Sequence, residues 1–185
     1  MPRKEKIIIV GAGLVGSLLT CLLAKRGYQI QLIERRSDPR KKLIDAGKSI
    51  NLALSTRGLK ALAMADMADV IEPELIPMTG RLMHDTSGTL TYQAYGKEGQ
   101  FINSVSRSGL NFKLLEKADT YDHVELIFDQ RCESVDFNSQ TIHLHNHITG
   151  ASQSLSADYI IGSDGAFSAI RGEMQKTDLF NYSQM

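Results

Sequence analysis

The stretch KIIIVGAGLVGSLLTCLLAKRGYQIQLIE, residues 6–34, decides the fold class. It opens with a short β-branched run, which is typical of a buried parallel strand. Residues 17–26 have the pattern of a helix that ends at Gly27, and residues 29–34 predict a second strand. A strand, a crossover helix and a second strand form a βαβ unit, so we predict an α/β protein built on a parallel sheet.

A glycine-rich turn joins the first strand to the helix. Gly11, Gly13 and Gly16 form the pattern G-x-G-x-x-G, and Glu34 follows 18 residues after the last glycine. Gly11 permits the tight turn, Gly13 lets a pyrophosphate approach the backbone, and Gly16 lets the helix pack on the strand. Amides at the helix start favour phosphates, while Glu34 can accept both hydroxyls of an adenosine ribose and would repel a 2′-phosphate. The pattern predicts a Rossmann-like dinucleotide site, for which FAD and NAD are alternatives.

Beyond the βαβ unit, the sequence predicts further helices and strands. The predicted elements are helices at 55–67 and 108–118, extended strands within 80–106, a strand at 124–128, a β-meander at 131–157 and a short strand at 159–162. Met64 and Met67 are expected to fill the core beside the first of these helices. Since parallel elements flank an antiparallel stretch, we expect a dinucleotide-binding domain, residues 1–75 and 100–185. Strands of a second domain, residues 76–99, interrupt it.

Charge and hydropathy narrow the function classes. The chain has 21 Lys+Arg and 21 Asp+Glu, so its net charge gives no reason to expect a nucleic-acid partner. Residues 1–42 carry a net charge of +7 and the remainder −7, but the basic clusters at 3–6 and 35–42 contain no aromatic residue that could stack on bases. Residues 7–24 are uncharged, which leaves a signal peptide or a short membrane span as an alternative. Their three glycines and the strand that follows favour the globular interpretation.

Cysteine and histidine give little support for a metal site. Cys21 and Cys132 are too few for a disulfide framework or a zinc site. His143, His145 and His147 would share one strand face, where a metal could bridge two of them. No carboxylate or cysteine spacing completes such a site, so we expect an exposed strand face and no metal.

A second motif follows the last predicted strand. Residues 162–171, GSDGAFSAIR, resemble the Asp-Gly motif of the flavin-dependent aromatic hydroxylases, G-x-D-G-x-x-S-x-x-R. The resemblance implies that Asp164 and Gly165 contact FAD and also shape the path used by NADPH. A strand–turn–helix in which these two residues only form the turn is the alternative.

A more specific resemblance begins at residues 47–58, GKSINLALSTRG. They are similar to the GRSINLALSxRG block of the kynurenine 3-monooxygenases, a family of FAD-dependent aromatic hydroxylases. The similarity stays in register along essentially the whole chain, through Ile76–Met78, Tyr95–Gly96, Ser104–Arg107 and Phe180–Gln184. Lys48 departs from the arginine of the family and lacks its bidentate geometry, so we assign it no flavin-orienting role.

The resemblance also implies binding residues. Beyond the glycine turn, the implied FAD contacts are Val15, Ile33, Glu34, Arg35, Arg36, Ala53, Arg107 and Cys132. Arg81 and Tyr95 correspond to the pair that binds the substrate carboxylate, to which an arginine offers a planar fork and a tyrosine an O–H donor. From sequence context alone, Arg81 would be a surface charge and Tyr95 a strand aromatic. No catalytic side chain is implied, because the flavin performs the chemistry.

The family's activity is the hydroxylation of L-kynurenine at ring position 3 with NADPH and O2. Family members continue beyond residue 185, so we expect a fold that is incomplete at the C-terminus, depends on the remainder of its own chain and is inactive alone. A bacterial member would be cytoplasmic, and a eukaryotic one would be anchored to the mitochondrial outer membrane through a C-terminal segment. The alternatives are another flavin hydroxylase, an NAD-linked oxidoreductase and an inactive FAD-binding fragment.

Overall fold

The computed structural model describes residues 5–41 and 50–176. The chain forms two compact units, of which the second spans residues 45–113 and the first contains the residues on both sides of it. Lys48 and the resemblance at Phe180–Gln184 lie outside the described residues. The strands expected for a second domain, residues 76–99, fall within the second unit together with the segments that flank them.

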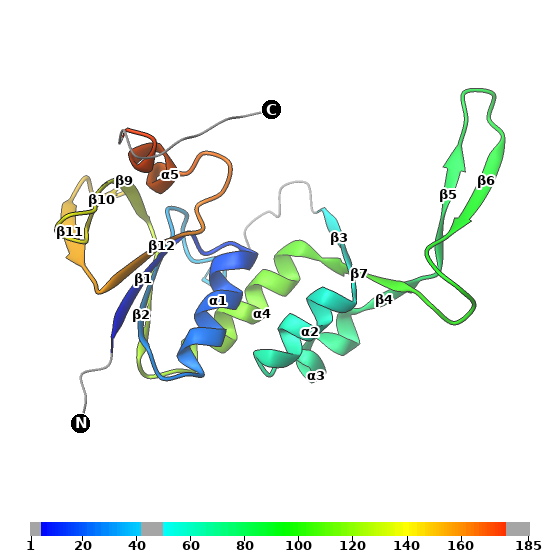
Figure 1. Ribbon diagram of the computed structural model, residues 1–185, viewed down its shortest axis with the longest axis horizontal. Helices are drawn as coiled ribbons and strands as arrows, with labels where there is room; N and C mark the ends of the chain where they lie inside the picture. The colour runs from blue at the N-terminus through cyan, green and yellow to red at the C-terminus, as the bar shows by residue number, and fades with distance from the viewer. Residues whose placement is uncertain (1–4, 42–49, 177–185) are drawn as a thin grey trace. The chain divides into compact units, whose positions relative to one another are not determined.

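A parallel four-stranded sheet forms the centre of the first unit (Figure 1). Its strands, in spatial order, are β12 (Tyr159–Gly162), β1 (Lys6–Val10), β2 (Gln29–Ile33) and β8 (Val124–Ile127). Helix α1 (Leu14–Ala24) connects β1 to β2, which confirms the predicted βαβ unit. The helix begins at Leu14, three residues before the predicted start, because the glycine turn already forms its first turn.

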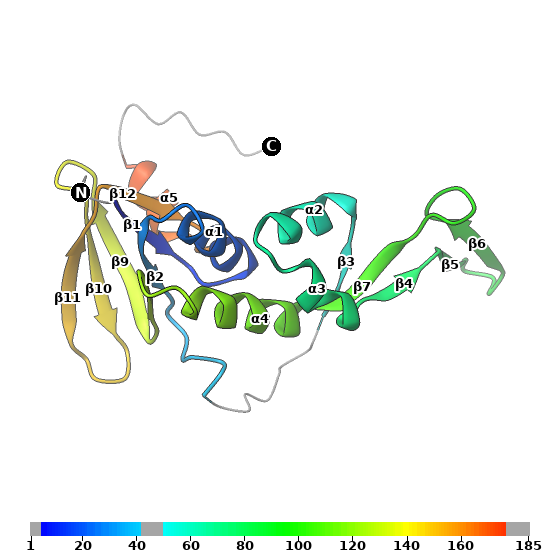
Figure 2. The same ribbon diagram turned by 90° about the horizontal axis from the view of Figure 1, so that it is seen from below.

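The two faces of this sheet are covered by different layers. Ile7 and Ile9 of β1 point to one face, where they pack with Ala24 of α1 and with Leu115. Ile8 and Val10 point to the other face and pack against the β-meander and Ile170. Figure 2 shows α1 and the meander on opposite sides of the sheet. Burial on both faces explains why β1 is a continuous apolar run rather than an alternating one.

The β-meander consists of three antiparallel strands, β9 (Gln130–Asp136), β10 (Thr141–Asn146) and β11 (Ser152–Ser156). Ile142 and Leu144 point inward and are at most 1% exposed, as predicted. His143 Nδ1 lies 2.9 Å from Ser154 Oγ and His145 Nδ1 lies 3.4 Å from Ser152 Oγ, on the outer face. These two histidines therefore occupy the exposed strand face that the sequence indicated.

The second unit contains short helices and two small antiparallel sheets. One sheet has the order β3 (Asn51–Leu54), β7 (Ile102–Ser106) and β4 (Ile76–Met78), and the other is the hairpin of β5 (Gly80–His84) and β6 (Leu90–Ala94). The helices are α2 (Thr56–Met64), α3 (Ala68–Ile71) and the 3₁₀ turn η1 (Glu72–Glu74). Helix α4 (Arg107–Asp119) begins in this unit and ends in the first, and α5 (Ala169–Met174) belongs to the first.

One core prediction in the second unit was wrong. Met67 is 1% exposed, but Met64 is 56% exposed although both were expected in the core. Helix α2 ends at Met64, and Asp66 then adopts a left-handed conformation with φ of 55°. This turn brings the Met67 amide back to the Leu62 carbonyl oxygen at 2.9 Å, so the helical spacing does not continue to Met67.

No helix within the described ranges is long and apolar enough to cross a membrane. The uncharged stretch that raised this alternative divides into β1, the glycine turn and α1.

Candidate cofactor site

The order of the parallel strands shows where a ligand is expected to bind in the first unit. From β1 the chain moves to β2 and β8 on one side, and later returns to β12 on the other side. The carboxyl ends of β1 and β12 therefore lie at the point where the strand order reverses. In open α/β sheets, ligands bind at such switch points. The two sequence motifs, the glycine turn after β1 and residues 163–165 after β12, both begin there.

Gly11 and Gly16 are required by the fold of the turn. Gly11 has a φ of 103°, and a Cβ on it would lie 2.5 Å from the carbonyl oxygen of Ser163. A Cβ on Gly16 would overlap the carbonyl oxygen of Gly11. The Gly11 amide also donates to the Ile33 carbonyl oxygen at 2.8 Å, which ties the turn to the end of β2. Both glycines are therefore fixed by protein contacts alone.

Gly13 is different, because no atom of the described residues lies where its Cβ would be. It is the N-cap residue of α1, with φ of −74°, and a Cβ on it would meet no heavy atom of the described residues within 4 Å. Ser17 makes the first amide hydrogen bond of the helix, to the Gly13 carbonyl oxygen at 2.9 Å. The amides of the preceding residues 14–16 have no acceptor within the helix. Open space in front of these amides suits a phosphate group.

Ser163 joins the two motifs. Its amide donates to the Val10 carbonyl oxygen at 2.8 Å, and its Oγ lies 2.9 Å from that oxygen and 2.8 Å from the Gly11 carbonyl oxygen. The hydroxyl thus shares its proton between the last residue of β1 and the first residue of the turn. This contact fixes the direction in which the chain leaves β1.

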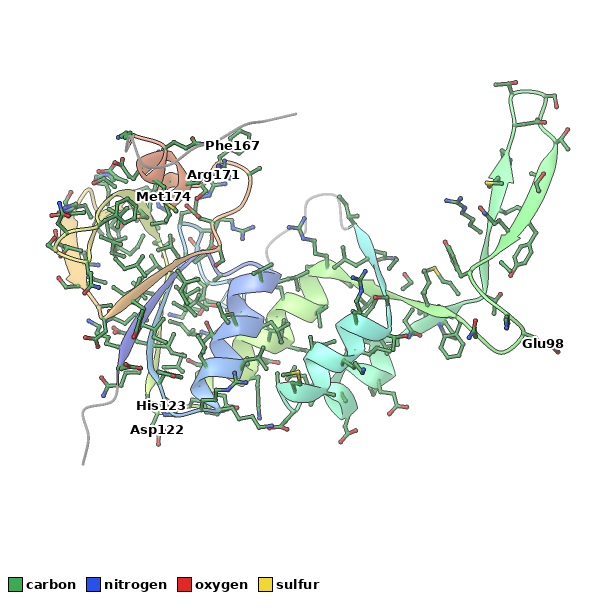
Figure 3. All side chains as sticks on the ribbon, in the orientation of Figure 1. Glu98, Asp122, His123, Phe167, Arg171 and Met174 are labelled. Atoms are coloured by element: carbon green, nitrogen blue, oxygen red, sulfur yellow. The ribbon has the colours of Figure 1, made fainter. Side chains whose placement is uncertain are left out.

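Asp164 organises the loop between β12 and α5. Its Oδ2 accepts from the Ala169 amide at 2.7 Å, whereas Oδ1 is shielded from water and has no hydrogen-bond partner among the described residues. Arg171 donates to the carbonyl oxygens of Gly165 and Ala166, and Gly165 has a φ of 80°. Figure 3 labels Arg171 beside Phe167, a side chain on this loop that is 94% exposed. A ligand that donates a hydrogen bond would satisfy Oδ1.

Glu34 is buried at the end of β2 and is already hydrogen-bonded. Its Oε2 accepts from the Ala12 amide at 2.9 Å, and its Oε1 accepts from the amide and Nε of Arg36 at 3.0 and 2.8 Å. A carboxylate has about four lone-pair positions, and donors on the described residues occupy three of them, which leaves one for a ligand. Burial raises the pKa of Glu34, but the hydrogen bonds from Arg36 and Ala12 outweigh burial, and the pKa lies below its ordinary value.

The segment after Glu34 is attached to the turn that precedes β9. The Gln130 amide donates to the Glu34 carbonyl oxygen at 3.0 Å, and the Asp129 amide donates to that of Arg36 at 3.1 Å. Ser37 Oγ donates to Asp129 Oδ1 at 2.5 Å. Asp129 has a left-handed backbone with φ of 60°, which asparagine and aspartate tolerate better than most residues. These bonds bring the start of β9 beside the end of β2.

Two residues implied as FAD contacts face the core instead of solvent. Ile33 is 1% exposed, and Cys132 is 7% exposed and packs with Ile142 and Leu144. Burial raises the pKa of the Cys132 thiol to about 11, so this group is a neutral core side chain. A cofactor contact at either position would have to use the main chain.

An ion network fixes the continuation of the same segment. Arg40 donates to both carboxylate oxygens of Asp38 through Nε and Nη2, at 2.9 and 2.8 Å. Its Nη1 donates to Asp119 Oδ2 at 2.8 Å. The Asp38 side chain is 4% exposed, and the guanidinium lies 5.7 Å from the ring centre of Phe128. The hydrogen bond from Arg40 holds the pKa of Asp38 below its usual range. The fork therefore ties the segment after β2 to the end of α4.

We expect Arg40→Ala to reduce the free energy of unfolding by about 1–2 kcal/mol, because Asp38 would keep its charge in a buried position without its fork. Urea denaturation at neutral pH measures this change. The loss should shrink on acidification, since a carboxyl with a lowered pKa contributes stability above its unfolded pKa and loses it as the pH falls through the folded value. An equal loss at all pH values would contradict this account.

In the second unit, Arg81 lies on β5 of the β5–β6 hairpin and Tyr95 directly follows β6, which ends at Ala94. Arg81 is opposite Gln93, to which its Nε donates at 2.7 Å. The Tyr95 amide donates to the Thr79 carbonyl oxygen at 2.9 Å, so Tyr95 is diagonal to Arg81 in the register of the hairpin. Diagonal neighbours of this kind are within reach of long side chains. Arg81 is exposed and Tyr95 is 42% exposed, so both are available to a ligand.

Comparison with known proteins decides which cofactor the site holds. Residues 4–180 match the model of the FAD binding domain family. The chain belongs to this family. The glycine turn, Glu34 and the Asp-Gly loop are thus parts of an FAD-binding domain, and NAD at this site is no longer an alternative.

Curated relatives share a narrower name. The chain is 43% identical over 183 residues to a kynurenine 3-monooxygenase of Myxococcus xanthus (strain DK1622), covering 98% of this chain and 39% of the relative. It is 42% identical over 181 residues to that of Dictyostelium discoideum, covering 97% and 38%, and 40% identical over 179 residues to that of Anopheles gambiae, covering 96% and 37%. The chain therefore spans about two fifths of the length of these relatives.

Solved structures agree on the fold. The p-nitrophenol 4-monooxygenase PnpA from Pseudomonas putida DLL-E4 superposes with a TM-score of 0.78 at 19% identity, covering 94% of this chain and 44% of that chain. The flavin-dependent monooxygenase PieE, solved in complex with FAD and substrate, gives a TM-score of 0.80 at 19% identity, covering 94% and 32%. At this identity the likeness establishes the architecture of the FAD-binding domain and no more.

The residues of the FAD-binding domain fit the cofactor. Among the described residues, the open space beside Gly13 would accommodate a pyrophosphate, Glu34 keeps an acceptor position that a ribose hydroxyl could use, and Asp164 Oδ1 has no donor. Val15 is 70% exposed at the start of α1, and Arg35 and Arg36 are exposed after β2. Ala53 pairs with Ser104, and the Arg107 amide lies 3.4 Å from the Ile50 carbonyl oxygen, so these two belong to the second unit.

The sequence analysis missed the residues that hold the site together. Ser163 carried a usable signal, a small polar residue between the strand and Asp164. Asp38 and Arg40 carried a weaker one, an acid and a base two residues apart after a strand. Asp129 sits between two strands, where an aspartate with positive φ is common. None of the three signals identifies the distant partner, which is Gly11 for Ser163, Asp119 for Arg40 and Ser37 for Asp129.

Proposed function

We propose that the full-length protein is a flavin-dependent monooxygenase that hydroxylates L-kynurenine at ring position 3, with NADPH and O2 as co-substrates. The observation that carries this proposal is the identity of 37–43% with relatives named kynurenine 3-monooxygenase along nearly the whole chain. The family match and the geometry at the switch point support the flavin part of the reaction. The substrate part rests on the names of the relatives and on the residues of the β5–β6 hairpin.

In this proposal the first unit holds the adenosine half of FAD. The amides that follow Gly13 receive the pyrophosphate, and Glu34 accepts a ribose hydroxyl. The Asp-Gly loop supplies Asp164 Oδ1 as an acceptor and contributes to the path of NADPH. When bound, FAD accepts hydride from NADPH and activates O2. The protein contributes binding, orientation and exclusion of water.

Arg81 and Tyr95 would orient the substrate. The amino-acid end of L-kynurenine carries a carboxylate, which a guanidinium can bind through two parallel N–H donors. Arg81 uses Nε on Gln93, so its terminal nitrogens are the donors that remain for this carboxylate. The Tyr95 hydroxyl, on the residue that directly follows β6, is the further donor in this proposal.

The remainder of the chain would complete the active site. We assign residues 1–75 and 100–185 to the FAD-binding domain and the strands of residues 76–99 to a substrate domain. Leu82, Leu90 and Tyr92 on the hairpin are 54–58% exposed, which suits strands that another segment covers. We therefore propose that residues 1–185 alone do not turn over NADPH. In a bacterial source the protein would be cytoplasmic, and in a eukaryotic one it would be attached to the mitochondrial outer membrane.

Two other functions differ from this one in measurable ways. Another flavin hydroxylase would bind FAD and oxidise NADPH without acceleration by L-kynurenine. A non-catalytic FAD-binding protein would be yellow and would not consume NADPH at all. The decisive experiment records the absorption spectrum of the purified full-length protein, identifies the released flavin, and measures NADPH oxidation with and without L-kynurenine. Stimulated oxidation together with 3-hydroxykynurenine formation supports the proposal.

Glu34→Ala should weaken FAD binding by about 1–3 kcal/mol, the range for losing a charge-assisted hydrogen bond. The substitution also leaves the Ala12 amide and Arg36 without their common acceptor. Titration of the apoprotein with FAD, followed by flavin fluorescence, measures the change. Glu133→Ala, which removes an exposed acid on β9, is the matched control and should bind FAD normally. Equal affinities for both variants would sink the assignment of Glu34.

A further inference from the structure

Glu34 and Arg36 are joined by two hydrogen bonds, which a residue that only contacts the cofactor would not need. Two donors of Arg36, its amide and its Nε, converge on the same oxygen of Glu34 at 3.0 and 2.8 Å. The Ala12 amide holds the other oxygen at 2.9 Å. The carboxylate is therefore fixed in one orientation by protein donors, and one lone-pair position is left for the ribose.

We propose that Arg36 is a positioning residue, which acts on FAD through Glu34 by holding the buried carboxylate ionised and correctly oriented. The inference rests on the proposed use of Glu34 as the ribose acceptor. It assigns to Arg36 a role separate from that of Arg35, whose side chain is exposed and directly precedes it.

The main chain around Arg36 is built for this role. The Asp129 amide donates to the Arg36 carbonyl oxygen at 3.1 Å, and the Arg36 amide itself donates to Glu34. Ser37 Oγ donates a hydrogen bond to Asp129 Oδ1 at 2.5 Å. With its amide and carbonyl both engaged, Arg36 has a fixed backbone, and its Nε returns to the residue two positions earlier. A freely solvated arginine would lose side-chain entropy in making such a bond, and the fixed backbone reduces that cost.

Among the residues that the structure describes, no charged group other than Arg36 is bonded to Glu34. Arg36 from the segment after β2 is the charged group bonded to it, while the glycine turn contributes the neutral Ala12 amide. On the connection before β9, the main chain of Gln130 contacts Glu34, and Asp129 is occupied by the Ser37 hydroxyl. Glu34 is 7% exposed, so water can replace little of what Arg36 provides. Without Arg36, burial would favour the protonated acid, and a protonated carboxyl is a poorer acceptor for a ribose hydroxyl.

The terminal nitrogens of Arg36 allow a rival interpretation. Its side chain is 69% exposed although Nε is engaged, so the terminal nitrogens face solvent. They could contact the cofactor phosphates directly. The two roles predict different effects of replacing Arg36. If Arg36 contacts a phosphate directly, the loss of FAD affinity should depend on salt and not on mild acid. If Arg36 acts through Glu34, the loss should become larger in mild acid.

The test measures FAD affinity of the full-length apoprotein by flavin fluorescence at about pH 8 and about pH 5, at low and high salt. Wild-type affinity should be nearly the same at both pH values, because the pKa of Glu34 is lowered and the carboxylate stays ionised. Arg36→Met keeps the amide but loses Nε and the charge. It should bind FAD more weakly, with a further loss of roughly three- to tenfold between about pH 8 and about pH 5.

A second pair of variants separates Glu34 from the rest of the site. Glu34→Gln carries no titratable group, so both this variant and Glu34→Gln combined with Arg36→Met should bind FAD with no pH dependence in this range. Arg36→Lys should restore the flat pH profile but not full affinity, since an ammonium cannot reproduce the geometry of Nε. Arg26→Met removes an exposed arginine at the end of α1 and should match the wild type.

The outcomes distinguish failure of this inference from failure of the proposed function. If the wild-type protein does not bind FAD, the proposed function is wrong. If it binds FAD and Arg36→Met shows a flat pH profile with a salt-dependent loss, Arg36 is a direct phosphate contact and the inference is overturned. Should Arg36→Met not fold, Arg36→Gln takes its place; a pH-independent affinity in that variant would equally overturn the inference.

Discussion

Gly13→Val should give a folded protein that purifies without flavin. The backbone of Gly13 has a φ of −74°, which valine adopts readily, and within 4 Å of a Cβ there lies no atom of residues 5–41 or 50–176. The apoprotein should therefore unfold at the wild-type temperature. The added methyl groups would occupy the space through which the pyrophosphate reaches the amides of α1. We expect FAD affinity to fall at least about a hundredfold, from overpacking and lost amide contacts.

Gly16→Ala is the matched comparison for this experiment. Its Cβ would overlap the carbonyl oxygen of Gly11, so the defect should appear in the stability of the apoprotein. The two variants are thus expected to differ in what they change. Gly13→Val should lower the flavin content, and Gly16→Ala should lower the unfolding temperature of the apoprotein. A normal flavin content in Gly13→Val would show that the phosphates bind elsewhere.

Arg81→Ala should lower kcat/KM for L-kynurenine roughly ten- to a hundredfold while leaving the FAD content normal. The substitution removes the planar fork proposed for the substrate carboxylate, and hydrogen bonds to charged groups contribute about 1.5–3 kcal/mol. Arg81 is exposed on the hairpin and touches Gln93, so the fold should tolerate its loss. Steady-state NADPH oxidation and product formation in the full-length enzyme measure the effect.

Two further variants make this result specific. Arg81→Lys should recover only part of the activity, because an ammonium cannot form the bidentate pair. Lys97→Ala removes an exposed cation from the same part of the chain and should leave kcat/KM unchanged. Arg81→Ala should also lose the preference for L-kynurenine over its decarboxylated analogue. Wild-type kcat/KM and an unchanged preference would make Arg81 an ordinary surface charge.

The elements of the fold that are set by local pattern could be predicted from the sequence. The strands β1 and β12, the turn at Gly11 and the meander all lie where apolar runs and glycines indicated. Their signals are carried by neighbouring residues, through side-chain periodicity and through the conformations that only glycine adopts easily. The helix boundary at Met64 was missed because a single left-handed residue, Asp66, ends the periodicity without a glycine or proline.

The detailed chemistry of the site could not be predicted, because it depends on contacts between distant residues. The sequence showed that Glu34 was an acid at a strand end, but not that Ala12 and Arg36 already occupy most of its lone pairs. Arg40 was counted within a basic cluster, whereas its charge is neutralised by Asp38 and by Asp119, 79 residues further along the chain. A run of like charges in a sequence therefore says little about the field at the site once the chain has folded.

The contact between Ser163 and the glycine turn has a consequence for the synthesis of the protein. Ser163 lies 152 residues after Gly11, yet its hydroxyl and backbone define how the chain turns out of β1. A ribosome would expose the turn long before it had made β12, and during that interval the nascent chain would lack one wall of its phosphate site. We therefore expect flavin to bind at the proposed site after the fourth strand has docked against β1, when the turn is complete.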